Sequence, residues 1–355
     1  MKTKTFPSIL PLLALGIAAL LLALWSGLVR LGWHLPSFAK LTVFHGGLIL
    51  NGFLGVLIPL ERVVALQRRW MILIPCLNGV GWMLWFGSPQ IGQALFLLGS
   101  LGMIAILGVM FKREPQLHTA TLLTGGLSWA MGNALWFFGV PIYGVVLWWL
   151  AFLVLTISGE RLELNRVLRL SNLERTSFMV IISLIITAAI LSIFHLDWGA
   201  RLSGVGYLSL MIWFVAKDIA FRNLRHPQPL TQFISTALAA GFLWLGIGGL
   251  LLIYLGKVTA GVAYDAVLHS IFVGFVGSMI FGHAPIIFPA LFGMTARFSP
   301  MLYYPLGLLH LSLILRLLGD FVLHEAFRRW GGLFNVIAAL VYFGLNIRML
   351  LGKER

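Results

Sequence analysis

The chain has 355 residues, of which 60% are hydrophobic and 10% are charged, and its formal net charge is +14. Soluble globular chains carry about 25% charged residues, so this composition excludes a soluble enzyme and an intrinsically disordered protein. The single cysteine, Cys76, excludes a disulfide framework or a cysteine metal cluster within one chain. Repeated apolar runs of about 20 residues predict an all-α polytopic membrane protein.

The apolar runs predict about 12 transmembrane helices in a single domain over residues 1–355. The runs are too long and too uniformly apolar for barrel strands, which need about 10 alternating residues. No small-residue cleavage site follows the first run, so we expect it to remain as a membrane span. The predicted spans cover about residues 8–33, 41–66, 70–87, 90–111, 117–139, 140–159, 176–196, 198–220, 230–256, 263–290, 302–322 and 330–351.

Lysine and arginine residues are distributed unequally between the two predicted sides of the membrane. With the N-terminus inside, 18 of the 25 fall in inner segments and six in outer ones, while Arg316 lies within a span. This positive-inside pattern predicts that both termini are cytoplasmic. The basic charge therefore indicates orientation and no nucleic-acid partner, because the chain has no basic tail and no module of interleaved basic and aromatic residues.

The longest polar interruption is the stretch of residues 160–175, which separates six predicted spans from six. No internal repeat relates the two halves. An amphipathic helix at the membrane surface is the simplest interpretation of this stretch.

Five histidines lie in or at the edge of predicted spans, where ionisable side chains are costly and usually functional. His45 lies early in the second span and His269 early in the tenth, and both spans run from outside to inside. At a rise of 1.5 Å per residue, each should be roughly 6–9 Å below the outer face. Two histidines at matched depth on different helices can bind one haem iron from both sides. This outer pair predicts a haem site, with interhelical hydrogen bonding by neutral histidines as the alternative.

A second pair of histidines is predicted nearer the inner side. His283 follows His269 by 14 residues, which on a straight α-helix is about 40° short of four turns, so both should share one helix face. His310, about eight residues into the eleventh span, should match the depth of His283. This inner pair predicts a second haem or a copper site, because imidazole binds both metals. His118, at the inner start of the fifth span, is either a further ligand of this site or an interfacial side chain.

Two charged residues near the outer pair have alternative roles. Arg316 lies in the outer third of the eleventh span, one turn before Asp320. It pairs either with haem propionates of the outer site or with Asp320. Asp265 precedes His269 by four residues, so it either orients the imidazole or is solvated at the interface.

The inner half of the tenth span contains Pro285 and Pro289, each of which removes a backbone donor. Irregular backbone at membrane depth is tolerated where it lines a cavity or is buried in protein. The segment is therefore either a ligand or substrate pocket or an ordinary proline kink.

The placement of His45 and His269 resembles the haem–copper oxidase catalytic subunits, whose low-spin haem is bound by histidines of the second and tenth spans. The chain more closely resembles the NnrS family, which are haem- and copper-containing membrane proteins linked to nitric oxide tolerance. That family's late histidine helix has the pattern H-x4-G-x2-G-x4-G, matched here by His269, Gly274, Gly277 and Gly282. The chain has neither the oxidases' adjacent His-His pair nor the NnrS His-Glu-Met motif, so the resemblance does not extend to proton-pumping oxygen reduction and implies copper less firmly than haem.

Together these features predict a b-type haem protein of the bacterial inner membrane with an oxidase-like bundle. We expect one or two haems b, and copper is the other candidate for the inner site. The protein would handle nitric oxide or another diatomic gas, or transfer electrons across the membrane with a redox partner, and an oxidoreductase activity stays open. The alternatives are a cofactor-free, proton-coupled transporter or channel with a broken-helix site near Pro285, and a structural subunit of a respiratory complex.

Overall fold

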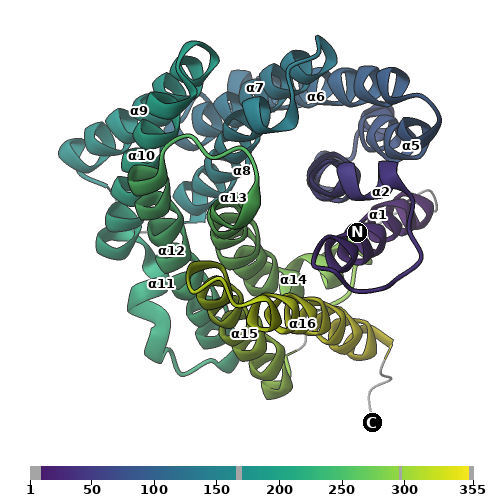
Figure 1. Ribbon diagram of the computed structural model, residues 1–355. Helices are drawn as coiled ribbons and strands as arrows, with labels where there is room; N and C mark the ends of the chain where they lie inside the picture. Colours follow the sequence, from purple (N-terminus) through teal and green to yellow (C-terminus); the bar gives the residue numbers. More distant parts are fainter. Residues whose placement is uncertain (1–8, 165–169, 296–297, 352–355) are drawn as a thin grey trace. The chain divides into compact units, whose positions relative to one another are not determined.

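The computed structural model describes residues 9–164, 170–295 and 298–351, which form helices and no strand (Figure 1). This confirms the all-α fold. Contacts between Cα atoms divide the chain into two compact units, Met1–Gly159 and Glu160–Arg355. The division coincides with the start of the polar interruption that separates the two sets of six predicted spans. The expectation of one domain over the whole chain stays a prediction.

The first unit consists of consecutive helices that pack on their neighbours in the chain, most extensively α5 on α6 and α6 on α7. One end of this unit brings together the start of α2 and the end of α5, because Lys40 Nζ donates a hydrogen bond to the carbonyl of Phe86 at 2.8 Å. The helical segments are α1 (Ile9–Arg30), α2 (Ala39–Val43), α3 (His45–Gly47), η1 (Leu48–Leu54), α4 (Gly55–Leu66), η2 (Arg69–Ile72), α5 (Leu73–Gly87), α6 (Pro89–Arg113), α7 (Leu117–Phe137) and α8 (Ile142–Leu164), which ends just beyond the division.

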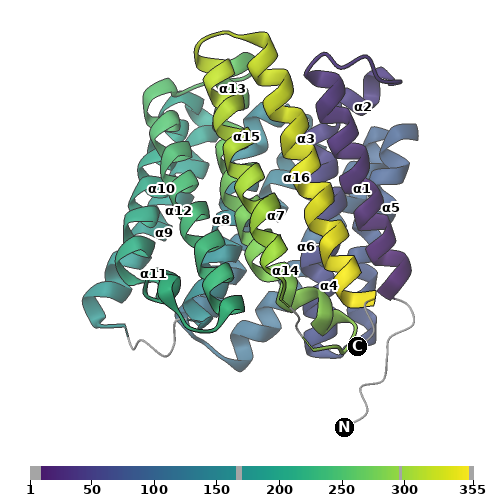
Figure 2. The same cartoon turned by 90° about the horizontal axis from the view of Figure 1, so that it is seen from below.

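The second unit has two main packing groups. In one, α10 lies between α9 and α12, and in the other, α15 and α16 run side by side (Figures 1 and 2). The described segments are α9 (Asn172–Phe194), α10 (Leu196–Lys217), α11 (Ile219–Arg222), η4 (Asn223–Arg225), α12 (Pro229–Leu255), α13 (Gly261–His269), η5 (Ser270–Val276), α14 (Gly277–Leu291), η6 (Pro300–Leu302), α15 (Tyr303–Phe321) and α16 (Glu325–Leu351).

Eleven helices of the described chain are long and apolar enough to cross a membrane. A helix of 21 residues, α7, also forms at the position of the fifth predicted span. It is less apolar than the others, yet its hydroxyls are satisfied locally, since Thr121, Thr124 and Ser128 each donate to the carbonyl four residues earlier. Large apolar side chains such as Leu98, Val180 and Leu311 are exposed along the spans. The protein is therefore a multi-pass membrane protein in contact with lipid.

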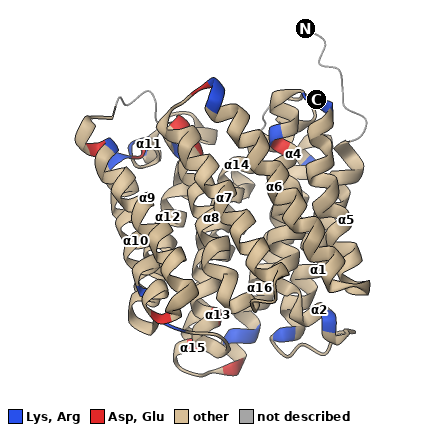
Figure 3. Ribbon diagram, turned by 90° about the horizontal axis from the view of Figure 1, so that it is seen from above, with Lys and Arg blue, Asp and Glu red and all other residues tan. Residues whose placement is uncertain are grey.

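Charged residues gather at the ends of the helices in each unit (Figure 3). In the second unit, ion pairs form at the predicted inner end between Arg161 and Asp218 and between Lys217 and Glu174. Three more ion pairs form at the predicted outer end: Asp197–Arg201, Asp265–Arg316 and Asp320–Arg328. Several basic residues used for the orientation lie outside the described residues: Lys2, Lys4, Arg166, Arg169, Arg297, Lys353 and Arg355. Cytoplasmic termini therefore remain a prediction.

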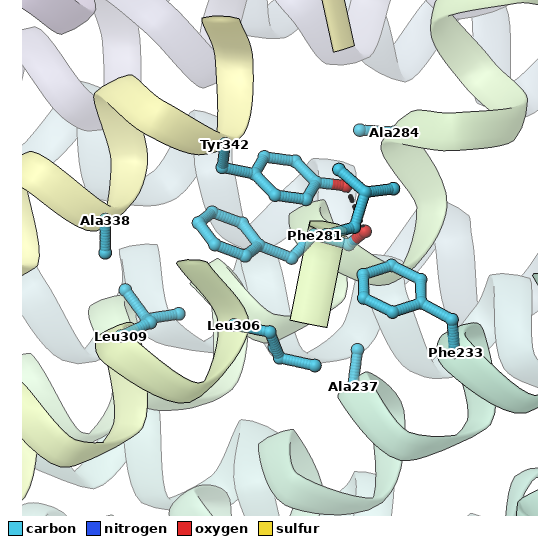
Figure 4. Packing of buried hydrophobic residues seen from close by; sticks show 9 residues of the cluster. Phe233, Ala237, Phe281, Ala284, Leu306, Leu309, Ala338 and Tyr342 are labelled. Carbon is cyan, nitrogen blue, oxygen red and sulfur yellow. Dashed lines mark hydrogen bonds between the residues drawn. The ribbon is translucent and has the colours of Figure 1, made fainter. Parts of the chain in front are cut away.

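A buried aromatic and aliphatic cluster joins α12, α14, α15 and α16 of the second unit (Figure 4). Phe281 and Tyr342 stack at its centre, with ring centroids 3.7 Å apart and planes within 8°. Pro285 cannot donate to the carbonyl of Phe281 four residues before it. The hydroxyl of Tyr342 donates to that carbonyl instead, so the break in the helix ladder is satisfied by a side chain of α16.

Candidate functional site

His45 is the first residue of α3, at the start of the second span. Its Nδ1 lies 2.9 Å from the carbonyl of Ala23 on α1. A carbonyl only accepts, so Nδ1 carries the proton in this bond and Nε2 is the nitrogen able to bind a metal. The ring lies against Gly27 of α1, where an added Cβ would come within 3.1 Å of its Cε1. A neighbouring helix therefore orients this histidine.

His269 ends α13 and is oriented largely by its own helix. Its Nδ1 lies 2.9 Å from the main-chain carbonyl of Asp265 and 3.3 Å from the carboxylate of the same residue. As with His45, the acceptor fixes the proton on Nδ1 and leaves Nε2 as the metal-binding nitrogen. Of the two alternatives for Asp265, the structure thus favours the orienting role.

Arg316 pairs with Asp265 and not with Asp320, the protein partner that its position on the helix suggested. Its Nε and Nη2 donate to the two carboxylate oxygens of Asp265 at 2.8 and 2.7 Å, which is a bidentate pair between α15 and α13. Asp320 instead pairs with Arg328, whose Nε lies 2.5 Å from its Oδ1. The pairing of Arg316 with Asp320 was predicted because the two residues are one turn apart on a helix. That spacing could not indicate the competing carboxylate of Asp265 on α13. His269, Asp265 and Arg316 consequently form one chain of contacts.

Both histidines are followed closely by a π-helical segment of seven residues. Within the second span η1 covers Leu48–Leu54, and within the tenth η5 covers Ser270–Val276. π-Helices are rare and are frequent at functional sites. The same local architecture of a histidine, a π-segment and then a proline-containing α-helix therefore occurs once in each unit.

The expectation that His269 and His283 share one helix face is wrong, because η5 lies between them. A π-turn holds one more residue than an α-turn, so the two are separated by about 140° and not 40°. The contacts agree with this. Asp265, one turn before His269 and on the same face, binds α15. Phe281 stacks on α16, and His283 lies about 200° around the helix from Phe281. His283 itself has Nδ1 2.7 Å from the carbonyl of Met279.

His310 differs from the other three histidines in its hydrogen bond. Its Nδ1 accepts from the indole Nε1 of Trp244 on α12 at 3.0 Å. An indole N–H only donates, so the neutral ring carries its proton on Nε2, which is buried without a partner among the described residues. This tautomer makes His310 a hydrogen-bond donor, and a metal could bind Nε2 only if the bond to Trp244 were lost.

The structure also offsets His310 from His283 along the bundle. Leu309, its neighbour, lies 3.7 Å from a Cβ placed on Gly277. His310 is therefore level with about Gly277, six residues or about 9 Å from His283 along the helix axis. His283 and His310 therefore do not lie at one depth, as the expected inner pair requires. Residue spacing alone could not predict the π-helical segment or the register of α15.

His118, the remaining candidate, is buried as the second residue of α7 in the first unit. Its Nε2 lies 3.9 Å from the carboxylate of Glu114, one turn earlier. This contact at the helix start favours the interfacial alternative over a ligand role. Among the described residues, no group of three His, Cys, Asp or Glu side chains is placed to hold a metal ion.

The proline-rich end of α14 borders a narrow hollow. It is lined by Pro285, Phe288 and Pro289 together with Met294, Thr295, Asn346, Met349 and Leu350. Its volume is about 10 Å³, on a scale where one water molecule needs about 10–15 Å³. The hollow is small, so both interpretations of this segment, a ligand pocket and an ordinary proline kink, stay predictions.

Sequence reasoning missed the partners that fix the histidine tautomers. The carbonyl of Ala23 and the indole of Trp244 lie 22 and 66 residues from the histidines they bind, and no local pattern reports such contacts. A family model described as a domain of unknown function, DUF8744, matches residues 9–351. No curated protein matches the chain in sequence.

Proposed function

The chain belongs to the DUF8744 family, and we propose that it is a membrane protein that binds haem b through His45 and His269. One observation carries this proposal: each of these histidines has its Nδ1–H bound by a main-chain carbonyl, so each presents Nε2 as the ligand atom. Metal-binding histidines are normally held in this way, because the second hydrogen bond fixes both tautomer and ring direction.

The donor set fits a haem better than a bare metal ion. A haem supplies four nitrogen ligands of its own and needs only one or two from the protein. The described residues offer single histidines and no cluster of three ligands. When bound, haem would supply electron transfer or binding of a diatomic gas such as nitric oxide, depending on whether one or two histidines occupy the iron.

The residues around His269 would support the group from the protein side. Asp265 holds the imidazole by its carbonyl and carboxylate, and Arg316 neutralises that carboxylate at membrane depth. With Asp265 as its partner, Arg316 acts on the histidine and is no longer the first candidate for haem propionates. His283 has the same Nδ1 arrangement, so a second haem or a copper ion would be held by this residue without His310.

The test is the optical spectrum of the purified protein, oxidised in air and then reduced with dithionite, with a pyridine haemochrome assay and a copper measurement on the same sample. We expect a Soret band and one or two haems per chain. His269→Ala and His45→Ala should each remove or shift that band, whereas His226→Ala, a half-buried loop histidine, is the matched control and should leave it unchanged.

Other results of these measurements would indicate a different function or a second metal site. Absence of haem from a protein expressed with ample haem supply would contradict the proposal and favour a cofactor-free transporter or channel. Two haems, with one lost in His283→Ala, would indicate a transmembrane electron path to a redox partner. Copper lost in His283→Ala would assign the inner metal.

A further inference from the structure

The first unit contains a buried asparagine whose orientation is fixed by its partner. Asn51 lies within η1 and is fully buried. Its Oδ1 accepts a hydrogen bond from the indole Nε1 of Trp129 on α7 at 2.9 Å. Because an indole N–H can only donate, the oxygen and nitrogen of this amide cannot be exchanged. The Nδ2 donor of Asn51 is left without a partner among the described residues.

In a second buried asparagine, Asn78 on α5, the acceptor oxygen is the group without a partner among the described residues. Its Nδ2 donates to the carbonyl of Ile74 at 3.0 Å, which fixes this amide as well. Its Oδ1 acceptor is buried and has no partner in the described part of the chain.

Asn78 and the indole that binds Asn51 both border one glycine. A Cβ placed on Gly55, the residue after η1, would lie 3.0 Å from Cζ2 of Trp129 and 3.4 Å from Cγ of Asn78. The indole that binds Asn51 and the amide of Asn78 therefore border the same position. Each amide therefore has one buried atom without a partner among the described residues, a donor on Asn51 and an acceptor on Asn78, in the neighbourhood of this glycine.

We propose that Asn51 Nδ2 and Asn78 Oδ1 hold a buried water molecule between η1, α5 and α7. Leaving a buried donor or acceptor unpaired costs roughly 1–3 kcal/mol, and buried waters typically satisfy two to four such groups. A cation is disfavoured by the N–H of Asn51, and an anion by the carbonyl oxygen of Asn78. A small neutral molecule that both accepts and donates satisfies both atoms, and water is the smallest.

The proposed water would also complete the hydrogen bonding around Trp129 of α7. The indole of Trp129 donates to Asn51 Oδ1, and a water bound to Asn51 Nδ2 would extend this contact into a connected network. The site does not depend on haem binding, because neither asparagine contacts a candidate ligand in the described contacts.

The direct test is a map of the full-length protein in lipid nanodiscs at a resolution that shows ordered water. We expect a peak within hydrogen-bonding distance of both Asn51 Nδ2 and Asn78 Oδ1. An empty gap, or a direct bond between the two amides, would overturn the proposal. This measurement uses the unmodified protein and needs no variant to fold.

A mutant cycle gives an independent test. Asn51→Leu and Asn78→Leu should each lower the thermal unfolding midpoint in detergent. The double variant should lose clearly less than the sum, because both substitutions remove the same water. Asn51→Leu combined with Asn346→Leu is the matched control: Asn346 lies in the second unit and bonds only within its own helix, so this pair should be additive. Additivity of Asn51→Leu with Asn78→Leu would contradict a shared water.

Discussion

The two histidine helices share an architecture but differ in what holds the imidazole. On the second span, His45 depends on α1, which supplies both the carbonyl of Ala23 and the surface at Gly27. On the tenth, His269 takes its hydrogen bond from its own helix and is backed by the largely buried pair of Asp265 and Arg316. The first arrangement relies on packing between helices, and the second on local geometry strengthened by charge.

This difference separates two ways of presenting a ligand atom. A histidine held by another helix loses its direction when that helix shifts, even though its own sequence is unchanged. A histidine held by the carbonyl four residues earlier keeps its direction as long as its helix forms, and the ion pair determines how that helix docks on α15. The first predictions below act on one of these helices and leave the other as an internal reference.

The largest effect is expected for Arg316→Met. This change leaves Asp265, whose side chain is 18% exposed, without its bidentate partner. Breaking a fully buried pair typically costs about 3–5 kcal/mol, and we expect a loss near the lower end of that range. Chemical denaturation in detergent should show a decrease of this size in the unfolding free energy. Lys217→Met is the matched control, because its pair with Glu174 is partly exposed and such pairs contribute about 0–1 kcal/mol.

A double variant sharpens this result. Asp265→Leu combined with Arg316→Met replaces the whole pair by apolar groups, which is often close to neutral. Its stability should therefore recover most of the loss. Equal losses in the single and double variants would mean that the charges are not the cause.

On the second span, Gly27→Leu should displace the ring of His45. An added Cβ at this position already comes within 3.1 Å of the imidazole, and overpacking typically costs about 1–3 kcal/mol. If His45 is a haem ligand, the haem content should fall while the circular dichroism of the helices is kept. Gly277→Ala is the control near His269, because its nearest neighbour lies 3.7 Å away. An unchanged spectrum in Gly27→Leu would argue against His45 as a ligand.

The fold was largely predictable because apolar run length decides whether a segment can span a membrane. Even α7, which is less apolar than the others, formed at its predicted position, since its hydroxyls bond within the helix. The site was less predictable. Spacing on a straight helix placed His283 on the face of His269, but a single extra residue in η5 changes the angle by about 100°.

The ion-pair partners of charged side chains also could not be predicted from their neighbours in the sequence. Arg316 has a carboxylate one turn away at Asp320, yet it binds Asp265, which is 51 residues earlier. Only the packing of α13 on α15 makes that contact, and no local spacing in the sequence indicates it. The tautomer of His310 depends likewise on Trp244 of another helix.

A smaller loss of stability is expected at Pro285 of the tenth span. Tyr342→Phe removes the hydroxyl that satisfies the carbonyl of Phe281 beside Pro285, and leaving that carbonyl buried and unpaired should cost about 1–3 kcal/mol. Tyr207→Phe is the matched control, because the Tyr207 hydroxyl has no hydrogen-bond partner in the described chain. Thermal unfolding should separate the two variants, and equal midpoints would show that the Tyr342 hydroxyl contributes nothing.

The smallest effect is expected for Trp244→Phe, which removes one hydrogen bond to His310 while keeping an aromatic ring. The stability should fall by about 1 kcal/mol. The informative change is in the tautomer, because without the indole donor the proton of His310 is no longer confined to Nε2. Nitrogen-15 NMR of histidine-labelled protein in detergent should therefore show the tautomer populations of one histidine change, and the signal absent from His310→Gln identifies it. If His310 keeps its tautomer in Trp244→Phe, another group fixes the ring, and Trp244 is not the residue that sets the tautomer.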